Sequence, residues 1–161
     1  MPKDRHRRAE ELDGCEVLVR RATDTDGDLV VEQSLAFNAE DGHPLSAEGV
    51  RALLHMLEPD CADGLVLVLT IDGRVCGHGV LSVGYGIEYG GRETFLEEIY
   101  IVPKCRGFGL GRILIEALEA NARDAGCRAV HLEVMAGNRA EHLYRRMGYA
   151  DRGSMLLTKK I

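Results

Sequence analysis

The sequence predicts an α/β protein with a mixed sheet in a single domain. Strand-like segments recur from residue 16 to residue 160, amphipathic helical segments separate them, and a strand–helix–strand unit occupies the second half. The 161 residues suffice for one compact domain with an extensive core. We expect the element order β-α-α-β-β-β-α-β-α-β over residues 15–161, after a basic, disordered tail over residues 1–14.

The first predicted elements are one strand and two helices. Residues 16–21 alternate apolar and polar side chains, which is typical of a half-buried strand. Apolar residues recur at helical spacing over residues 29–37 and again over residues 46–57. Ser46 is placed to cap the second helix, because its hydroxyl can accept a hydrogen bond from a first-turn amide.

Three strands are predicted next. The apolar run at residues 65–71 is typical of a buried strand, and the Asp-Gly pair at 72–73 indicates a tight hairpin turn. Residues 74–83 form the returning strand, and residues 93–102 form a further one. The glycine-rich, tyrosine-bearing segment 84–91 is expected to be a loop or an irregular hairpin between them.

The second half holds the strand–helix–strand unit and a short final helix. Residues 109–125 carry an apolar stripe at helical spacing, and Gly126 marks the end of this helix. Residues 128–134 read as a strand, and residues 138–148 as a short helix. A last strand is predicted at residues 155–160.

The composition limits the classes of protein that the chain can be. Hydrophobic residues make up 45% of it, mean hydropathy is −0.12, and no apolar run approaches the length of a membrane span. We therefore expect no membrane partner, and the charged N-terminal residues do not resemble a secretory signal. The net charge of −6 argues against nucleic acid as a partner.

The cysteines point to a reducing compartment. They are five, at Cys15, Cys61, Cys76, Cys105 and Cys127. None forms a Cys-x-x-Cys pair, so the spacing indicates neither a metal site nor a disulfide framework. We expect reduced thiols, a cytoplasmic protein and no bound metal.

The most specific motif is a glycine turn between a strand and a helix. Gly107, Gly109 and Gly111 occupy alternate positions, and Arg106 and Arg112 flank them. Glycines leave the backbone N–H groups unshielded by side chains, and a helix N-terminus attracts anions. The arginines can add charge-assisted hydrogen bonds. The turn therefore predicts a site for a phosphate-bearing ligand.

Two nucleotide motifs fit this turn poorly. A P-loop needs Gly-Lys-Ser/Thr at its end, where this chain has Gly111-Arg112-Ile113. A dinucleotide fold needs Gly-x-Gly-x-x-Gly in its first strand–helix turn and an acid about 20 residues later. Glu133 is suitably placed, but the glycine spacing differs and the unit lies late in the chain. Dinucleotide binding stays open as an alternative.

A second motif identifies a family. The Arg106-x-x-Gly109-x-Gly111 turn resembles the pyrophosphate loop of the GNAT superfamily of N-acetyltransferases. The Ala-x-x-Leu-Tyr-x-x-x-Gly-Tyr pattern at residues 140–149 resembles the second motif of that family. The resemblance covers residues 15–161 and is to small bacterial members, with residues 95–100 also similar to polyamine acetyltransferases. It implies the GNAT fold, with central strands that splay apart.

The resemblance implies acetyl-CoA as cosubstrate. The glycine turn would hold the pyrophosphate, and the strand before it would pair with the pantetheine arm. The residues that would contact acetyl-CoA are Ile99, Tyr100, Ile101, Arg106, Gly107, Phe108, Gly109, Leu110, Gly111, Arg112, Asn138 and Tyr144. The family carries an Asn three residues before the motif alanine, whereas Asn138 is only two before Ala140, which puts the Asn138 contact in doubt.

The resemblance also implies catalytic roles. Tyr144 matches the general acid of the family, which protonates or stabilises the departing thiolate. Glu97 and Glu98 are candidates to accept the proton of the amine. Adjacent strand residues point to opposite faces unless a bulge intervenes, so one glutamate is expected to face the substrate. The resemblance to polyamine-type members implies that this residue is Glu97.

The predicted function is transfer of an acetyl group from acetyl-CoA to a primary amine of a small molecule or peptide, by direct attack in a ternary complex. Acidic residues near the site hint at a cationic amine. The family implies a possible homodimer. Two alternatives are a non-catalytic acyl-CoA-binding module and the dinucleotide-binding protein.

Overall fold

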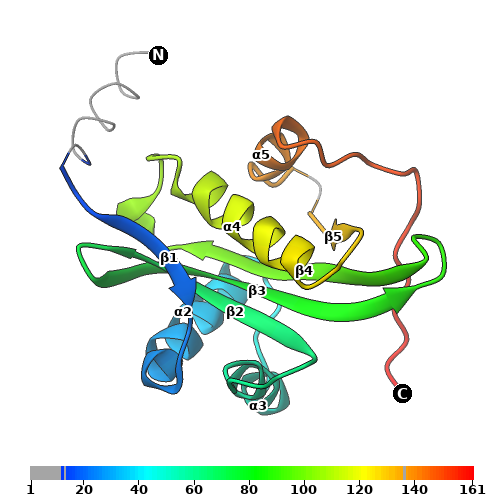
Figure 1. Cartoon of the computed structure of the whole chain (residues 1–161), viewed down its shortest axis with the longest axis horizontal. Helices are drawn as coiled ribbons and strands as arrows, with labels where there is room; N and C mark the ends of the chain where they lie inside the picture. The colour runs from blue at the N-terminus through cyan, green and yellow to red at the C-terminus, as the bar shows by residue number, and fades with distance from the viewer. Residues whose placement is uncertain (1–11, 13, 136) are drawn as a thin grey trace.

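The computed structural model describes residues 12, 14–135 and 137–161. Within them a five-stranded sheet has helices on both faces (Figure 1). Its strands, in spatial order, are β1 (Val17–Arg21), β2 (Gly64–Ile71), β3 (Arg74–Gly86), β4 (Gly91–Ile101) and β5 (Val130–Leu132). The helical elements are η1 (Asp24–Asp26), α2 (Gly27–Glu40), α3 (Ala47–Met56), η2 (Pro103–Cys105), α4 (Leu110–Asp124) and α5 (Glu141–Arg146).

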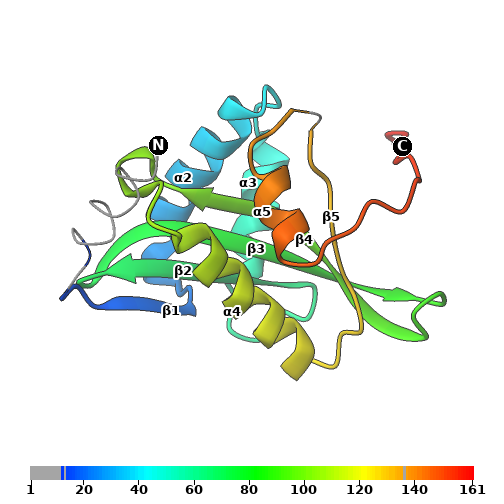
Figure 2. The same ribbon diagram turned by 90° about the horizontal axis from the view of Figure 1, so that it is seen from above.

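The sheet is mixed, as predicted. Strands β1 to β4 pair antiparallel in chain order, whereas β5 runs parallel to β4 after the α4 crossover. Helices α4 and α5 lie on one face of the sheet, and α2 and α3 lie on the other (Figures 1 and 2).

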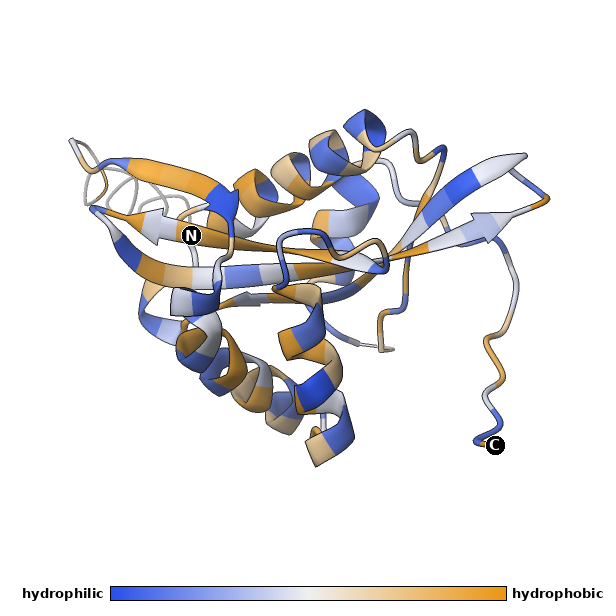
Figure 3. Ribbon diagram, turned by 60° about the horizontal axis from the view of Figure 1, so that its bottom comes forward, coloured by the Kyte–Doolittle hydropathy of each residue, from blue (hydrophilic) through white to orange (hydrophobic). Residues whose placement is uncertain are grey.

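Apart from Thr70, strand β2 carries no polar side chain, as expected of a strand that helices cover on both faces. Leu67 and Leu69 belong to the core beneath α4, whereas Val66 and Val68 belong to the core beneath α2 and α3. In Figure 3 the strands carry long hydrophobic stretches, and each helix alternates hydrophobic and hydrophilic ones. This is the pattern expected of helices that bury one stripe against a central sheet.

The last two strands of the sheet separate. Strand β5 pairs with β4 only at residues 94–96, so the edge of β4 from Glu97 to Ile101 has no neighbouring strand on that side within the described residues. The other edge of β4 pairs with β3 through a bulge, where Val80 opposes Glu98 and Leu81 opposes Leu96. Glu97 is the extra residue of that bulge.

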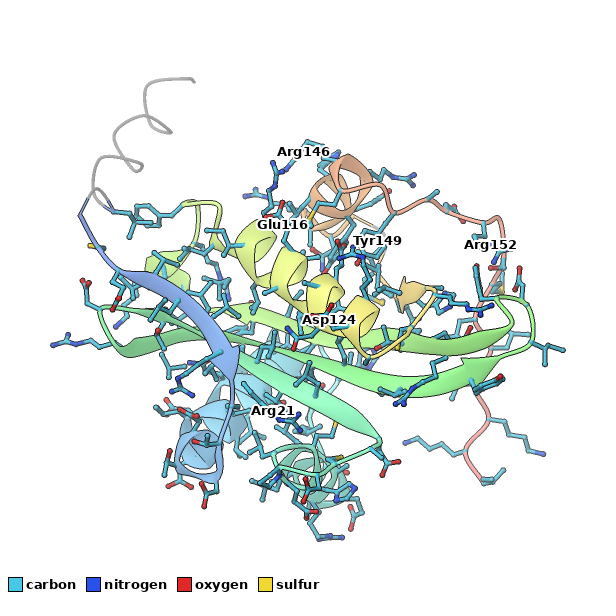
Figure 4. All side chains as sticks on the ribbon, viewed as in Figure 1. Arg21, Glu116, Asp124, Arg146, Tyr149 and Arg152 are labelled. Atoms are coloured by element: carbon cyan, nitrogen blue, oxygen red, sulfur yellow. The ribbon has the colours of Figure 1, made fainter. Side chains whose placement is uncertain are left out.

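The predicted last strand is wrong. Residues 155–160 join no strand, and their apolar side chains are exposed, with Met155 at 81% and Leu157 at 82%. A strand needs a partner edge, but Arg152 bonds to Glu88 and Tyr89, which draws the chain toward the β3–β4 hairpin (Figure 4).

Other differences concern element boundaries. The β3–β4 hairpin extends into the predicted loop and leaves only residues 87–90 as its turn, while β5 is shorter than predicted. Helix α2 runs three residues further than predicted at its C-terminal end. Of the predicted tail, only residues 12 and 14 lie within the described part. No helix in the described ranges has the length and apolarity to cross a bilayer.

Candidate active site

A cleft of about 1730 Å³ opens where β4 and β5 separate. Its walls are the unpaired half of β4, the glycine turn and first half of α4, helix α5, and the C-terminal end of α2. All the predicted acetyl-CoA contacts line it, together with Tyr144 and Glu97. Glu98 is the one predicted site residue outside it. The volume exceeds that of most pockets for drug-sized ligands, which suits an extended molecule.

The glycine turn has the backbone conformation that only glycine adopts readily. Gly107 and Gly109 have φ values of +92° and +82°, in the left-handed region, and Gly109 is the N-cap of α4. No side chain caps this helix. Across the described ranges, the amides of residues 107–111 donate to no protein acceptor. The turn thus presents a row of unused donors at a helix N-terminus, which favours an anion.

Gly111 has a different role from the other two glycines. It lies inside α4, and a Cβ there would meet Leu143 of α5 at 3.6 Å, an ordinary contact distance. Glycine at position 111 therefore leaves the first-turn amides of α4 exposed to the cleft, and its backbone is not strained.

Both motif arginines already have protein partners. Arg106 donates through Nε to the Ile101 carbonyl at 2.6 Å and through Nη2 to both Glu40 carboxylate oxygens, at 2.9 and 3.1 Å. Its guanidinium lies 5.1 Å from the centre of the Tyr100 ring. Arg112 pairs with Glu116 at 2.7 Å, one turn along α4. Arg106 therefore joins the glycine turn to β4 and α2.

Tyr144 is buried at the wall that α5 contributes. Only 7% of it is exposed, and its ring lies 5.8 Å from that of Tyr149, edge-on. Burial, assisted by the nearby Asp41 carboxylate, raises the pKa of Tyr144 to about 12. The phenol is therefore fully protonated at neutral pH and can donate a hydrogen bond.

Tyr149 fixes the end of α5 against α4. Its hydroxyl donates to the Glu119 carboxylate at 2.8 Å, and burial raises the pKa of Tyr149 above its usual range. Figure 4 shows Tyr149 between the two helices, below Arg146. This contact holds the helix that carries Tyr144.

The bulge in β4 separates the two candidate glutamates. Glu97 is exposed, lines the cleft and accepts a hydrogen bond from the Ser82 hydroxyl at 2.5 Å. Leu96 packs in the core beneath α4, yet Glu98, two residues later, faces α2 on the opposite side. The extra residue explains this change of face, because regular alternation would keep residues 96 and 98 on one side.

Glu98 is the centre of a buried polar network. One carboxylate oxygen accepts from the Ser34 hydroxyl at 2.8 Å and the Asn38 amide at 2.7 Å. The other lies 2.9 Å from Nε2 of His78, which is fully buried and whose Nδ1 lies 3.2 Å from Gln33. The network clamps α2 onto β3 and β4. His78 is thus a packed side chain of this network.

Helix α2 supplies cleft residues that no motif signalled. Phe37, Asn38, Glu40 and Asp41 all line the cleft, because α2 continues past its predicted end and the Glu98 network holds it there. Asn138 also lines the cleft, but its side chain accepts a hydrogen bond from the Ala140 amide at 2.9 Å and so shapes the entry to α5.

Comparisons with known proteins agree with this geometry. Residues 32–149 match the family model described as the acetyltransferase (GNAT) family. A thialysine N-epsilon-acetyltransferase from Bos taurus is 39% identical over 80 residues, which cover 45% of this chain and 47% of that protein. An IAA acetyltransferase from Azospirillum brasilense is 33% identical over 115 residues, or 70% of each protein. The chain spans about half the length of the first of these relatives.

A solved structure shows the same fold. An aminoglycoside N-acetyltransferase in complex with CoA superimposes with a TM-score of 0.72, at 20% identity, over 91% of this chain and 96% of that one. At this identity the likeness concerns the arrangement of the backbone.

Proposed function

Because the chain belongs to the acetyltransferase (GNAT) family, we propose that it transfers an acetyl group from acetyl-CoA to a primary amine by direct attack in a ternary complex. One observation carries the proposal: the cleft brings the unused amides of the glycine turn, the unpaired edge of β4 and the Tyr144 phenol into one space.

The amides of residues 107–111 suit a pyrophosphate, as they are unsatisfied donors at a helix N-terminus. The edge of β4 at Ile99 and Tyr100 can pair with the amide groups of a pantetheine arm, as an added strand would. A main-chain N–H of β4 can also stabilise a tetrahedral oxyanion. Acetyl-CoA, when bound, would supply the acetyl group as a thioester, and CoA would leave as the thiolate.

The amine must lose a proton before it attacks. A lysine-like amine with a pKa near 10.4 is neutral in about one molecule in two thousand at pH 7, which costs roughly 4–5 kcal/mol. Glu97 is the glutamate of the pair that faces the cleft, and we propose that it accepts this proton directly or through water. Glu98 is bonded within the protein and is assigned no proton transfer.

Tyr144 acts on the departing sulfur mainly as a hydrogen-bond donor. Its pKa is about 12, whereas a thiol has a pKa near 8.5. Complete proton transfer to the thiolate would be uphill by roughly 5 kcal/mol. Donation without transfer avoids this barrier and still stabilises the developing negative charge.

The acceptor is proposed to be a cationic amine. The cleft carries the Asp41 carboxylate at the C-terminal end of α2 and the Glu97 carboxylate on β4, whereas Glu40 is already paired with Arg106. The Bos taurus relative is named for thialysine, which carries amines. Carboxylates at the entrance of the cleft would raise the local concentration of a cationic substrate.

The test combines binding with product detection. CoA should raise the melting temperature, and NAD should not. Incubation with acetyl-CoA and a panel of cationic, neutral and anionic amines should give acetylated product, measured by mass spectrometry because the protein's own cysteines react with thiol dyes. Tight CoA binding without any product would favour the acyl-CoA-binding module. Stabilisation by NAD alone would overturn the proposal.

A further inference from the structure

Three different metal-binding side chains meet between α3 and β2, away from the cleft. His55 lies in the last turn of α3, and Cys61 and Asp63 lie in the connection that leads to β2. One donor atom from each, a ring nitrogen, a sulfur and a carboxylate oxygen, lies within 4.8 Å of the other two. The segment follows α3, on the face of the sheet opposite α4 and α5 (Figure 1), and none of the three residues lines the cleft.

The distances suit a tetrahedral ion. His55 Nε2 lies 3.0 Å from Asp63 Oδ2 and 3.7 Å from Cys61 Sγ. Ligand atoms of tetrahedral Zn²⁺ are roughly 3.4–3.6 Å apart, given metal–ligand bonds of about 2.0–2.3 Å. The two distances from His55 Nε2 would need to change by only a few tenths of an ångström. The distance between Cys61 Sγ and the Asp63 carboxylate would need to change somewhat more, and all three atoms could then bind one ion. The mixture of nitrogen, sulfur and oxygen donors favours Zn²⁺ over Mg²⁺ or Ca²⁺.

A neighbouring carboxylate orients the histidine. Glu58 Oε2 lies 3.3 Å from His55 Nδ1, so both ring nitrogens face carboxylate oxygens. A hydrogen bond from Nδ1 to a carboxylate is the usual support of a zinc-bound imidazole, because it leaves Nε2 to the metal. The Glu58 and Asp63 carboxylates also place negative charge beside the ring, which attracts a cation to this point.

The backbone holds the other two ligands in place. The Cys61 amide donates to the Glu58 carbonyl at 3.2 Å, and the Asp63 carbonyl accepts from the Val83 amide of β3 at 2.7 Å. The Cys61 thiol forms no disulfide. The connection is therefore anchored at both ends around the three donor atoms.

We propose that His55, Cys61 and Asp63 bind Zn²⁺, with water as the fourth ligand. Cys61 binds as the thiolate, and its proton passes to solvent. The metal links the end of α3 to the start of β2. The site was not predicted from the sequence, because His-x₅-Cys-x-Asp lacks the paired cysteines by which zinc sites are usually found.

Cobalt and zinc titrations of chelator-treated protein without a histidine tag test the proposal. Co²⁺ should produce a thiolate-to-metal absorption band, Zn²⁺ should abolish it, and Zn²⁺ should raise the melting temperature. Cys61→Ser should remove the band, and Asp63→Asn should weaken Zn²⁺ binding about tenfold or more. Cys127→Ser and Asp60→Asn are matched controls outside the cluster and should bind as the parent does.

Two results would overturn the site: no cobalt–thiolate band in the parent, or a band that persists in Cys61→Ser. Circular dichroism verifies that each variant folds, and Asp63→Asn tests the site independently of any thiol substitution. CoA binding is measured in parallel. If the parent binds CoA but not zinc, only the zinc site is wrong. If it binds zinc but not CoA, only the proposed function is wrong.

Discussion

Two regions on either side of β4 treat polar groups in opposite ways. In the network around Glu98, the carboxylate, the buried His78 and the polar side chains of α2 satisfy one another. In the cleft, the amides of residues 107–111 have no protein partner within the described chain, and the edge of β4 beyond Leu96 pairs with no strand there. The first arrangement holds the fold together, and the second leaves hydrogen-bonding capacity for a ligand. On the proposed function, polar groups thus serve stability on one side of β4 and ligand binding on the other.

Replacement of Glu98 tests this division most strongly. Glu98→Ala leaves three donors without their acceptor, and we expect it to lower the free energy of unfolding by about 3–5 kcal/mol. The matched control is Glu97→Ala, one residue away but exposed in the cleft, which should change stability by less than about 0.5 kcal/mol. Urea unfolding measures both. If the two substitutions lower the free energy of unfolding equally, the distinction between a stabilising Glu98 and a cleft-facing Glu97 is wrong.

Tyr144→Phe should change rate and leave stability nearly unaltered. In the part of the chain that the structure describes, the Tyr144 hydroxyl donates to no protein group. Its removal therefore breaks no hydrogen bond of the fold and affects only contacts with a bound ligand. We expect kcat to fall about 100-fold, with CoA affinity within about threefold of the parent. Because the phenol has a pKa of about 12, it loses its proton only above the usual assay range, and the parent kcat should show no fall from this group up to about pH 10.5. An unchanged kcat in the variant would remove Tyr144 from the mechanism.

The glycine turn offers a matched pair of substitutions. Gly109→Ala places a side chain at a φ of +82° and should weaken CoA binding by about 1–2 kcal/mol, through strain and displacement of the amides. Gly111→Ala fits without strain beside Leu143, so calorimetry should show a smaller loss. Equal losses would show that shielding of the amides matters more than the left-handed backbone.

A smaller effect is expected at the other end of α2, where polar groups are again satisfied by the protein but nearer to solvent. Arg20 makes two hydrogen bonds to Asp26, at 2.7 and 2.9 Å, and lowers the pKa of that carboxyl to about 2. Because the folded pKa is lowered, the stabilisation is complete above about pH 4 and is lost as pH falls toward 2. Since Arg20 is half exposed, Asp26→Asn should cost only about 1 kcal/mol at pH 7. The difference from the parent should shrink between pH 4 and pH 2 in acid unfolding. If the difference in unfolding free energy between Asp26→Asn and the parent stays constant from pH 4 to pH 2, the assigned role of the Arg20–Asp26 pair is wrong.

Local pattern predicted most of the fold and part of the site. The Ser46 cap is confirmed by its bond to the Gly49 amide at 3.1 Å, and the helix after the glycine turn begins where the motif placed it. The last strand failed because alternation within a segment says nothing about an available edge. The cleft residues on α2 were not predicted because they are positioned by bonds from Ser34 and Asn38 to Glu98, which lies 64 and 60 positions away in the chain. Long-range contacts of this kind leave no periodic signal.

The extra residue in β4 changes which face of the strand the even-numbered residues occupy. Before it, even-numbered positions such as Leu96 look toward α4, and after it odd-numbered positions such as Ile99 do. Shortening the strand by Glu97 alone would restore uninterrupted alternation. Leu96 and Glu98 would then be neighbours on opposite faces, so Glu98 would still face α2 and Ile99 would still face α4. If the strand instead kept Glu97 and lost the bulge, regular alternation would turn Glu98 into the apolar layer under α4 and Ile99 toward α2. The bulge therefore lets one strand carry an additional cleft carboxylate without exchanging the two faces of the residues that follow it.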